Sequence, residues 1–271
     1  MTKPFFDLKS THNPHRWCLP VTRNLSVGPP GKPFLFGGAA LAAAVSAMEQ
    51  TCGRPAIWAT AQYLSFARPP SIVDLDVWTP NQGRHTSQAR VIGHVNDREI
   101  ITVNAALGER PGDIADQWVT PPPAPPPEDC PVTDHWRAEV DDLNYRFELR
   151  AVSGRLRGKD KLVGRGQGRV VVWARLKEAH PVGSDVLCVM ADFVAQAISD
   201  AIGLWAGGNS LDNTIRFARL VPTEWVLCDM RIEAVQNGVA HGVQHLYSQS
   251  GVLMASASQS LILRVHETPA G

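Results

Sequence analysis

Two polar side chains that could carry chemistry lie in strand-like stretches of this 271-residue chain. Asp212 comes near the start of the stretch 211–217, whose apolar and aromatic residues would partly desolvate the carboxylate, raise its pKa and make it a better base. Gln259 lies among small residues, and its amide can both donate and accept hydrogen bonds. The carboxylate could therefore act as a base, and the amide could hold a water or a carbonyl group. An exposed position on a strand or turn explains each of them equally well.

Gly37 and Gly38 begin an alanine-rich segment, and because alanine is the best helix former, residues 36–50 are predicted to form a helix. The free backbone N–H groups at the start of a helix favour negative charge. A residue without a side chain also lets a ligand approach the backbone closely. Both glycines are therefore candidate substrate-binding residues, and close packing of the helix on a sheet is the alternative explanation.

Other residues that could carry chemistry have simpler explanations. His241 and His245 are four residues apart, which in a strand separates them by about 13 Å on one face, too far to share a metal. The basic run at 155–161 fits a solvated loop or a contact with phosphate groups. The five cysteines are widely spaced and include no CxxC pair, which argues against a disulfide framework and a structural zinc site. We therefore expect no metal ion.

A proline-rich stretch divides the chain near its midpoint. Six prolines lie between Thr120 and Glu128, where they disfavour a helix or a central strand and favour an extended spacer. The tripeptide at 66–68 recurs at 217–219, a separation of 151 residues. In both halves a helical segment precedes a series of strand-like segments. This arrangement predicts an internally duplicated α+β protein.

The expected elements follow from the periodicity of the apolar residues. The helices are predicted over residues 36–50 and 186–204, the second with Ser184 or Asp185 as its N-cap. The strands are predicted over residues 57–67, 73–78, 86–94 and 99–107 in the first half, and over 145–150, 169–176, 213–219, 224–232, 239–247 and 252–265 in the second. Each half is thus one long helix followed by an antiparallel meander, with short strands before the helix.

The bulk composition restricts the choice of partners. Lys+Arg and Asp+Glu both number 26, so no net field draws the chain to a phosphate backbone, and we expect no nucleic-acid partner. No stretch approaches the roughly 20 apolar residues that span a bilayer. The N-terminus also lacks an apolar core of the length of a signal peptide. We therefore expect a cytoplasmic protein without a membrane partner.

Several short motifs, taken in order, resemble the double-hotdog acyl-CoA thioesterase II family. In the first half they are Phe36-Gly37-Gly38, the segment 64–69 with Arg68-Pro69 at its end, and the segment 83–91. In the second half they are Ala191-Asp192-Phe193, Ser210-Leu211-Asp212-Asn213-Thr214, Glu224-Trp225 and the segment 251–259. The resemblance spans most of the chain outside the proline-rich stretch and the termini. It rests on the order and spacing of the motifs, not on any one of them.

The resemblance implies two hotdog domains, each a curved antiparallel sheet wrapped around one helix, at residues 1–119 and 132–271 with a linker at 120–131. It also implies that an Asp, a Ser or Thr hydroxyl and a Gln position the attacking water. The Asp falls on Asp212 and the Gln on Gln259. Because the first-half counterpart of Asp212 is Ala61, we expect one active site per chain.

The position of the hydroxyl is where this sequence departs from the family. It falls on Glu233, and residues 224–247 contain neither Ser nor Thr. Either Glu233 supplies the polar contact, or another group acts with Asp212 and Gln259, or the hydrolase activity is weak or lost. Two carboxylates that share a water could work if one of them stays protonated.

The resemblance thus predicts a thioesterase that hydrolyses acyl-CoA to a free acid and CoA without a cofactor, with the helix start at Gly37 and Gly38 polarising the thioester oxygen. A non-catalytic acyl-CoA-binding protein is the first alternative. An enoyl-CoA hydratase or dehydratase that uses His241 or His245 is the second, and a β-sandwich binding module remains if the fold is not a hotdog. Exposed sheet edges also favour a homodimer or a larger homo-oligomer.

Overall fold

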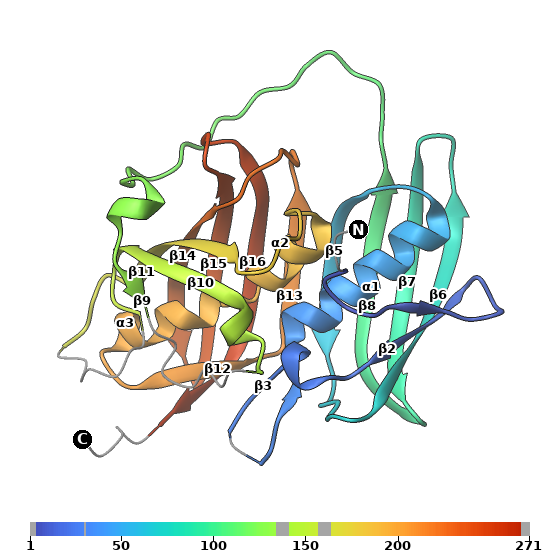
Figure 1. The fold of residues 1–271 in the computed structure, drawn as a ribbon, viewed down its shortest axis with the longest axis horizontal. Helices are drawn as coiled ribbons and strands as arrows, with labels where there is room; N and C mark the ends of the chain where they lie inside the picture. The colour runs from blue at the N-terminus through green and yellow to red at the C-terminus, as the bar shows by residue number, and fades with distance from the viewer. Residues whose placement is uncertain (1–3, 30, 134–140, 157–163, 267–271) are drawn as a thin grey trace.

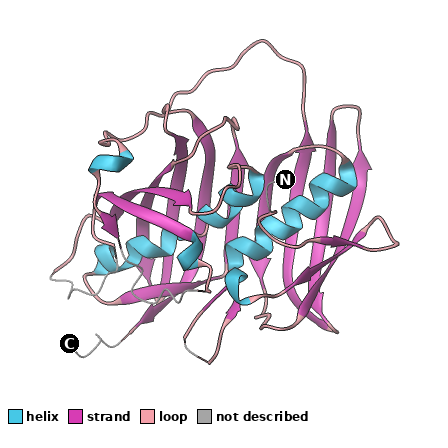
Figure 2. Ribbon diagram, in the orientation of Figure 1, coloured by secondary structure: helices cyan, strands magenta, loops and turns pink. Residues whose placement is uncertain are grey.

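The computed structural model describes residues 4–29, 31–133, 141–156 and 164–266. Within these residues, fourteen strands form one large sheet, and the helices pack against it (Figure 1, Figure 2). This layering of helices on an antiparallel sheet is the α+β class that the sequence predicts. In the part of the chain that is described, no helix is both long and apolar enough to cross a membrane.

The first half packs helix α1 (Gly37–Cys52) on antiparallel strands. These are β5 (Ala56–Tyr63), β6 (Ile72–Gln82), β7 (Thr86–Val95) and β8 (Arg98–Gly108), and β2 (Arg16–Pro20) pairs with β6. Their order across the sheet is β2-β6-β7-β8-β5. Along β6, Val73, Leu75 and Val77 are buried and alternate with more exposed residues, as the period-2 pattern predicts.

The second half repeats this strand order. Its strands are β11 (Arg169–Leu176), β13 (Asp212–Phe217), β14 (Val226–Gln236), β15 (Val239–Ser248) and β16 (Leu253–Val265), in the order β11-β14-β15-β16-β13. Strand β10 (Phe147–Ser153) extends the sheet beyond β11. The shorter elements are β1 (Lys9–Ser10), β3 (Ser26–Val27), β4 (Phe34–Leu35), β9 (Val132–Thr133), β12 (Ala206–Ser210), η1 (Arg23–Leu25) and η3 (Asn144–Arg146). The shared order supports the predicted internal duplication.

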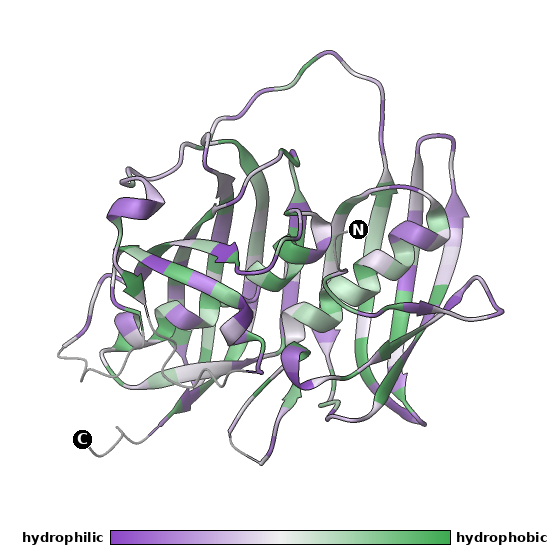
Figure 3. Ribbon diagram, viewed as in Figure 1, coloured by the Kyte–Doolittle hydropathy of each residue, from purple (hydrophilic) through white to green (hydrophobic). Residues whose placement is uncertain are grey.

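Strands β5 and β13 join the two halves into one continuous sheet. They pair antiparallel, with Ala61 opposite Asn213. Ala59, Ala61 and Ile215 are buried, and small residues at this seam let the helices of both halves lie close to the sheet. Figure 3 shows apolar residues alternating with polar ones along the strands.

The second helix is broken, so the prediction of one helix over residues 186–204 is wrong. Helix α2 (Ser184–Met190) is followed by a 3₁₀ turn, η4 (Phe193–Ala197), and by α3 (Ile198–Ile202). At the break, the Met190 carbonyl accepts a hydrogen bond of 2.9 Å from Gln244 Nε2. The Ala191 carbonyl accepts one of 3.2 Å from Asn213 Nδ2. Side chains of the sheet thus replace the N–H donors that a continuing helix would supply.

The start of α2 also differs from the prediction. Its N-cap is Gly183, and the predicted N-caps Ser184 and Asp185 lie inside the first turn. The Ser184 hydroxyl instead donates a hydrogen bond of 2.8 Å to Glu49 Oε2 near the end of α1. This residue therefore ties the two helices together and does not cap its own.

The segment after β8 packs on the second half. Residues 109–126 have no regular secondary structure and lead to the 3₁₀ turn η2 (Pro127–Asp129) (Figure 1). Trp173 Nε1 donates a hydrogen bond of 2.9 Å to the Pro125 carbonyl, and the Tyr247 hydroxyl donates one of 3.4 Å to the Thr120 carbonyl. The proline-rich stretch is therefore a connection anchored to the protein surface.

Candidate active site

A carboxylate is buried where the chain breaks after α2. Asp192 is only 5% exposed. Its Oδ2 accepts a hydrogen bond of 2.8 Å from the Gly38 N–H at the N-terminus of α1. Its Oδ1 accepts one of 3.0 Å from Ser210 Oγ and another from Gln259 Nε2. Donors from three separate elements therefore converge on one carboxylate.

Both halves of the protein supply these donors. Gly38 belongs to the first half, whereas Ser210 ends β12 and Gln259 lies in β16 of the second. Gln259 Nε2 also donates a hydrogen bond of 2.6 Å to Ser210 Oγ, so the amide, the hydroxyl and the carboxylate contact one another. We name Gly38, Asp192, Ser210 and Gln259 the Asp192 cluster. Because Gly38 comes from the first half, the cluster is complete only where the two halves meet.

Burial raises the pKa of Asp192 from its ordinary 3.8 to about 6. Hydrogen bonds from Gln259, Gly38 and Ser210 favour the charged form and lower the pKa, but desolvation is the larger effect. The carboxylate is therefore mostly ionised at pH 7 and binds a proton more strongly than an exposed aspartate does. Such a pKa suits general-base catalysis near neutral pH.

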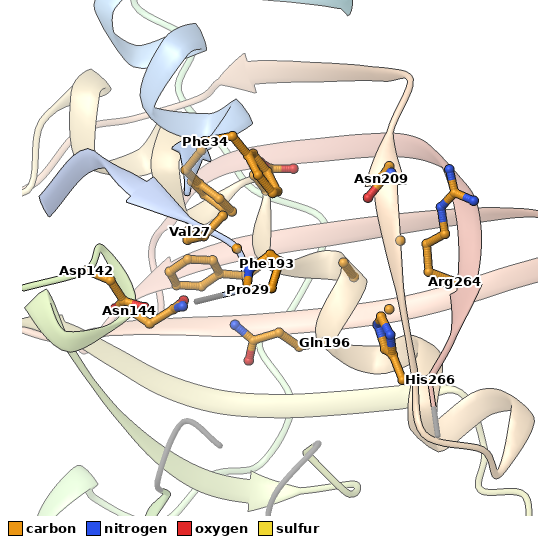
Figure 4. Close-up of a pocket in the computed structure, with 16 residues that line it drawn as sticks. Val27, Pro29, Phe34, Asp142, Asn144, Phe193, Gln196, Asn209, Arg264 and His266 are labelled. Carbon is orange, nitrogen blue, oxygen red and sulfur yellow. The ribbon is translucent and has the colours of Figure 1, made fainter. Parts of the chain in front are cut away.

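A cavity of about 490 Å³ borders Asp192. Phe34 and Phe193 contribute aromatic surface to it, while Asn209 and Arg264 contribute polar groups on the opposite side (Figure 4). Its volume lies in the range of pockets that bind small molecules. Asp192 is thus shielded from bulk solvent but adjoins a space that a ligand can fill.

The two glycines at the start of α1 permit close contact between the halves. A Cβ at position 38 would lie 2.9 Å from the Val189 Cα and 2.9 Å from the Asp192 Cβ, and a Cβ at position 37 would lie 2.8 Å from Asp192 Oδ2. Since such distances are too short for real contacts, any side chain here would displace α2 or Asp192. Close packing therefore explains both glycines. The Gly38 N–H is also committed to Asp192, whereas no described residue accepts a hydrogen bond from the Gly37 N–H.

Asp212, the predicted base, lies at the first position of β13. Its Oδ1 accepts a hydrogen bond of 2.8 Å from the Ser260 N–H. Successive residues of a strand face opposite sides of a sheet, and the next residue, Asn213, is fully buried and bonded to Ala191 below the helix break. Asp212 therefore lies on the other face. The structure does not bring its carboxylate and the Gln259 amide together.

Glu233, on which the predicted hydroxyl position falls, is exposed. It lies at an irregularity of β14 between Ile232 and Ala234, and β15 separates this strand from β16, which carries Gln259. Two strand spacings amount to about 10 Å. Glu233 is therefore not part of the Asp192 cluster, and the hydroxyl of the cluster is that of Ser210.

Asp192 and Ser210 are the members of the cluster that were not predicted from the sequence. Asp192 could have been predicted, because it is the one acidic residue within the apolar stretch 186–198. An acidic residue is rarely buried without a function or a partner. Ser210 had no comparable signal, since serine is common at the ends of strands. Both residues lie inside motifs on which the family resemblance rests.

The histidines and the basic run lie elsewhere. His241 is exposed and contacts Ser260 Oγ at 3.1 Å, and the His245 ring packs beside Tyr247. Neither histidine contacts the Asp192 cluster. Within the described ranges, no group of three or more His, Cys, Asp and Glu side chains is placed to hold a metal ion.

The predicted basic run is described only in part. Residues 157–161 lie outside the described residues. Arg155 Nε donates a hydrogen bond of 3.0 Å to Asp200 Oδ1, a buried carboxylate of α3. Arg155 therefore has a structural contact inside the second half.

Comparisons with known proteins identify the family. The family model of the acyl-CoA thioesterase C-terminal domain matches residues 127–263. A solved structure from Novosphingobium aromaticivorans, described as a candidate thioesterase, is 36% identical in sequence, with a TM-score of 0.84. The similarity covers 95% of this chain and 98% of that chain. The chain therefore belongs to the acyl-CoA thioesterase family and is a thioester hydrolase. The family predicted from the sequence, the acyl-CoA thioesterase II (TesB-like) family, is thus confirmed.

More distant solved structures show the fold. The acyl-CoA thioesterase II TesB2 from Mycobacterium marinum is 19% identical with a TM-score of 0.73, and covers 96% of this chain and 97% of its own. A hot dog protein of unknown function from Alicyclobacillus acidocaldarius is 16% identical with a TM-score of 0.82, and covers 96% of each chain. The predicted hotdog fold is thus confirmed. A comparison with curated protein sequences finds no match.

Proposed function

We propose that this thioesterase hydrolyses acyl-CoA to a free acid and CoA with Asp192 as its general base. The observation that carries the proposal is a buried carboxylate that borders a cavity and contacts the Gln259 amide and the Ser210 hydroxyl. An aspartate, a hydroxyl and a glutamine are the groups that the family resemblance implies. We assign these three roles to Asp192, Ser210 and Gln259.

The attacking water needs an acceptor for each of its two hydrogens. The Asp192 carboxylate takes the proton that is transferred. Gln259 Oε1 is buried and has no partner in the described part of the chain, so it accepts a hydrogen bond from the other O–H of the water. The water oxygen bonds to the thioester carbon, and the electrons of the C=O bond move to its oxygen. When the C–S bond breaks, Asp192 returns its proton to the departing thiolate of CoA, which restores the ionised carboxylate.

Asp212 has a structural role in this proposal. Its carboxylate holds the N–H of Ser260, the residue that follows Gln259, and so fixes the start of β13 against β16. Loss of this contact should disturb Gln259 less than loss of its direct partner Asp192. Catalysis by Asp212 with Glu233 stays as the competing prediction.

We also propose that each half is one hotdog domain, with residues 1–119 and 132–271 joined by a linker at 120–131. The matching strand order on either side of the β5–β13 pair supports this division. A homodimer or larger homo-oligomer and a cytoplasmic location stay predictions, the first of which light scattering can test. Both ends of the sheet are two-residue strands, β1 and β9, which leaves only short edges for a partner.

Turnover of short, medium and long acyl-CoAs by the wild type and by Asp192→Asn tests the proposal. The asparagine keeps the shape of the side chain but cannot take the proton, so kcat should fall about 10²–10⁴-fold. Unchanged turnover in the variant would remove Asp192 from the mechanism. A wild type that binds acyl-CoA without releasing thiol would favour a non-catalytic binding protein, and one that hydrates an enoyl-CoA would favour a hydratase.

A further inference from the structure

Tyr63, at the end of β5, carries a hydroxyl that the proposed mechanism does not use. The residue is partly accessible, but its hydroxyl oxygen is buried and has no hydrogen-bond partner within the described residues. A buried hydroxyl without a partner destabilises the fold, so its presence calls for a functional explanation. Burial, and after it the charge of Asp192, raises the pKa of Tyr63 well above the usual value. The group is therefore a hydrogen-bond donor throughout the working pH range.

Tyr63 and Asp192 flank the start of α1. A Cβ at position 37 would lie 3.0 Å from Tyr63 Cζ, the carbon that bears the hydroxyl, and 2.8 Å from Asp192 Oδ2. The Tyr63 ring and the Asp192 carboxylate therefore both lie against Gly37, at the positive end of a 16-residue helix. The N–H of Gly37 finds no acceptor among the described residues, and it begins this helix.

Hydrogen bonds of the sheet hold Tyr63 in this position from both sides. Its N–H donates a hydrogen bond of 3.0 Å to the carbonyl of Leu211, which links it to the chain directly after Ser210. On its other side, Tyr63 pairs with Ile101 of β8. The backbone of Tyr63 is therefore held between β8 of the first half and the residue that joins β12 to β13 in the second half.

We propose that Tyr63 is a further catalytic residue, whose O–H donates a hydrogen bond, together with the Gly37 N–H, to the thioester oxygen as negative charge develops there. This inference rests on the proposed hydrolysis. Such donors bind the oxyanion more strongly than the neutral carbonyl, so they lower the barrier without tightening the binding of substrate. The substrate oxygen is then the acceptor that the hydroxyl lacks within the protein.

The variant Tyr63→Phe tests this assignment because it removes the hydroxyl and keeps the ring. Its kcat should fall about 10²–10³-fold, the range for removal of one oxyanion donor. Its KM should change little, since the lost interaction forms mainly in the transition state. Its Tm should stay the same or rise, because the missing hydroxyl had no partner to lose.

Tyr247→Phe is the matched control. Tyr247 is buried, but unlike that of Tyr63 its hydroxyl has a partner: it donates to the Thr120 carbonyl, and it contacts no member of the Asp192 cluster. This variant should keep its kcat and lose a little stability. The two variants should therefore show opposite patterns. Tyr63→Phe should lose rate but keep its stability, and Tyr247→Phe should keep its rate but lose stability.

Two outcomes overturn the assignment. If the wild type releases thiol and Tyr63→Phe does so with a kcat within about twofold of it, Tyr63 donates nothing to the transition state, while the proposed hydrolysis stands. If the wild type releases no thiol from any acyl-CoA, the proposed function and the role of Tyr63 fail together. A fall of kcat confined to Tyr63→Phe, with Tm retained, supports it.

Discussion

The rate of hydrolysis should follow the ionisation of Asp192. A general base acts only in its deprotonated form, and the pKa of this carboxyl is about 6. For one group with that pKa, about a tenth of the molecules are ionised at pH 5 and about nine tenths at pH 7. Because kcat/KM reports the ionisations of the free enzyme, it should rise about tenfold between pH 5 and pH 7 and then level off.

The loss of thioester absorbance is a suitable assay for this profile, because thiol reagents lose reactivity in acid. Measurements at constant ionic strength keep the screening of other charges fixed. The residual rate of Asp192→Asn should show no step at the same midpoint. A profile that is flat from pH 5 to pH 7, or one with a midpoint at about 4 as for an exposed aspartate, would refute the reasoning.

Other predictions concern the same cluster. Gly38→Ala should lower the free energy of unfolding by about 1–3 kcal/mol in a urea titration, since its Cβ would lie 2.9 Å from the Val189 Cα. Unchanged stability would argue against the close contact of the two helices. Ser210→Ala removes a donor that lowers the pKa of Asp192, so the midpoint of the pH–rate profile should move to higher pH; a shift to lower pH would contradict this. Because folding raises the pKa of Asp192, its contribution to stability is present in acid and is lost as pH rises through about 6. Wild type should therefore lose about 2 kcal/mol relative to Asp192→Asn between pH 4 and pH 7, and a constant difference would contradict the burial.

The regular elements of this protein could be predicted because their signals are local. The alternation of Val73, Leu75 and Val77 marks β6, and the alanine-rich run marks α1, which ends where Gly53 adopts a positive φ of 62°. The break in the second helix could not be predicted in this way. It depends on Gln244 and Asn213, which lie far along the chain and reach the Met190 and Ala191 carbonyls only after the sheet has formed.

The site was predictable in part for the same reason. Gln259 is a polar residue among small ones, and its strand and its buried face follow from the alternation around it. Choosing between Asp192 and Asp212 requires the register of β13, because a shift of one residue moves a side chain to the opposite face. It also requires knowledge that α1 and α2 meet at Gly38, which no local pattern contains.

The most direct test of the central claim is a comparison of kcat/KM for Asp192→Asn and Asp212→Asn with the same acyl-CoA. Both variants remove one carboxylate charge and keep the side-chain shape, so they differ only in which carboxylate is lost. With Asp192 as the base, Asp192→Asn should lose at least about 100-fold, and Asp212→Asn should stay within about tenfold of the wild type. The reverse order, with Asp212→Asn the inactive variant, would contradict the account.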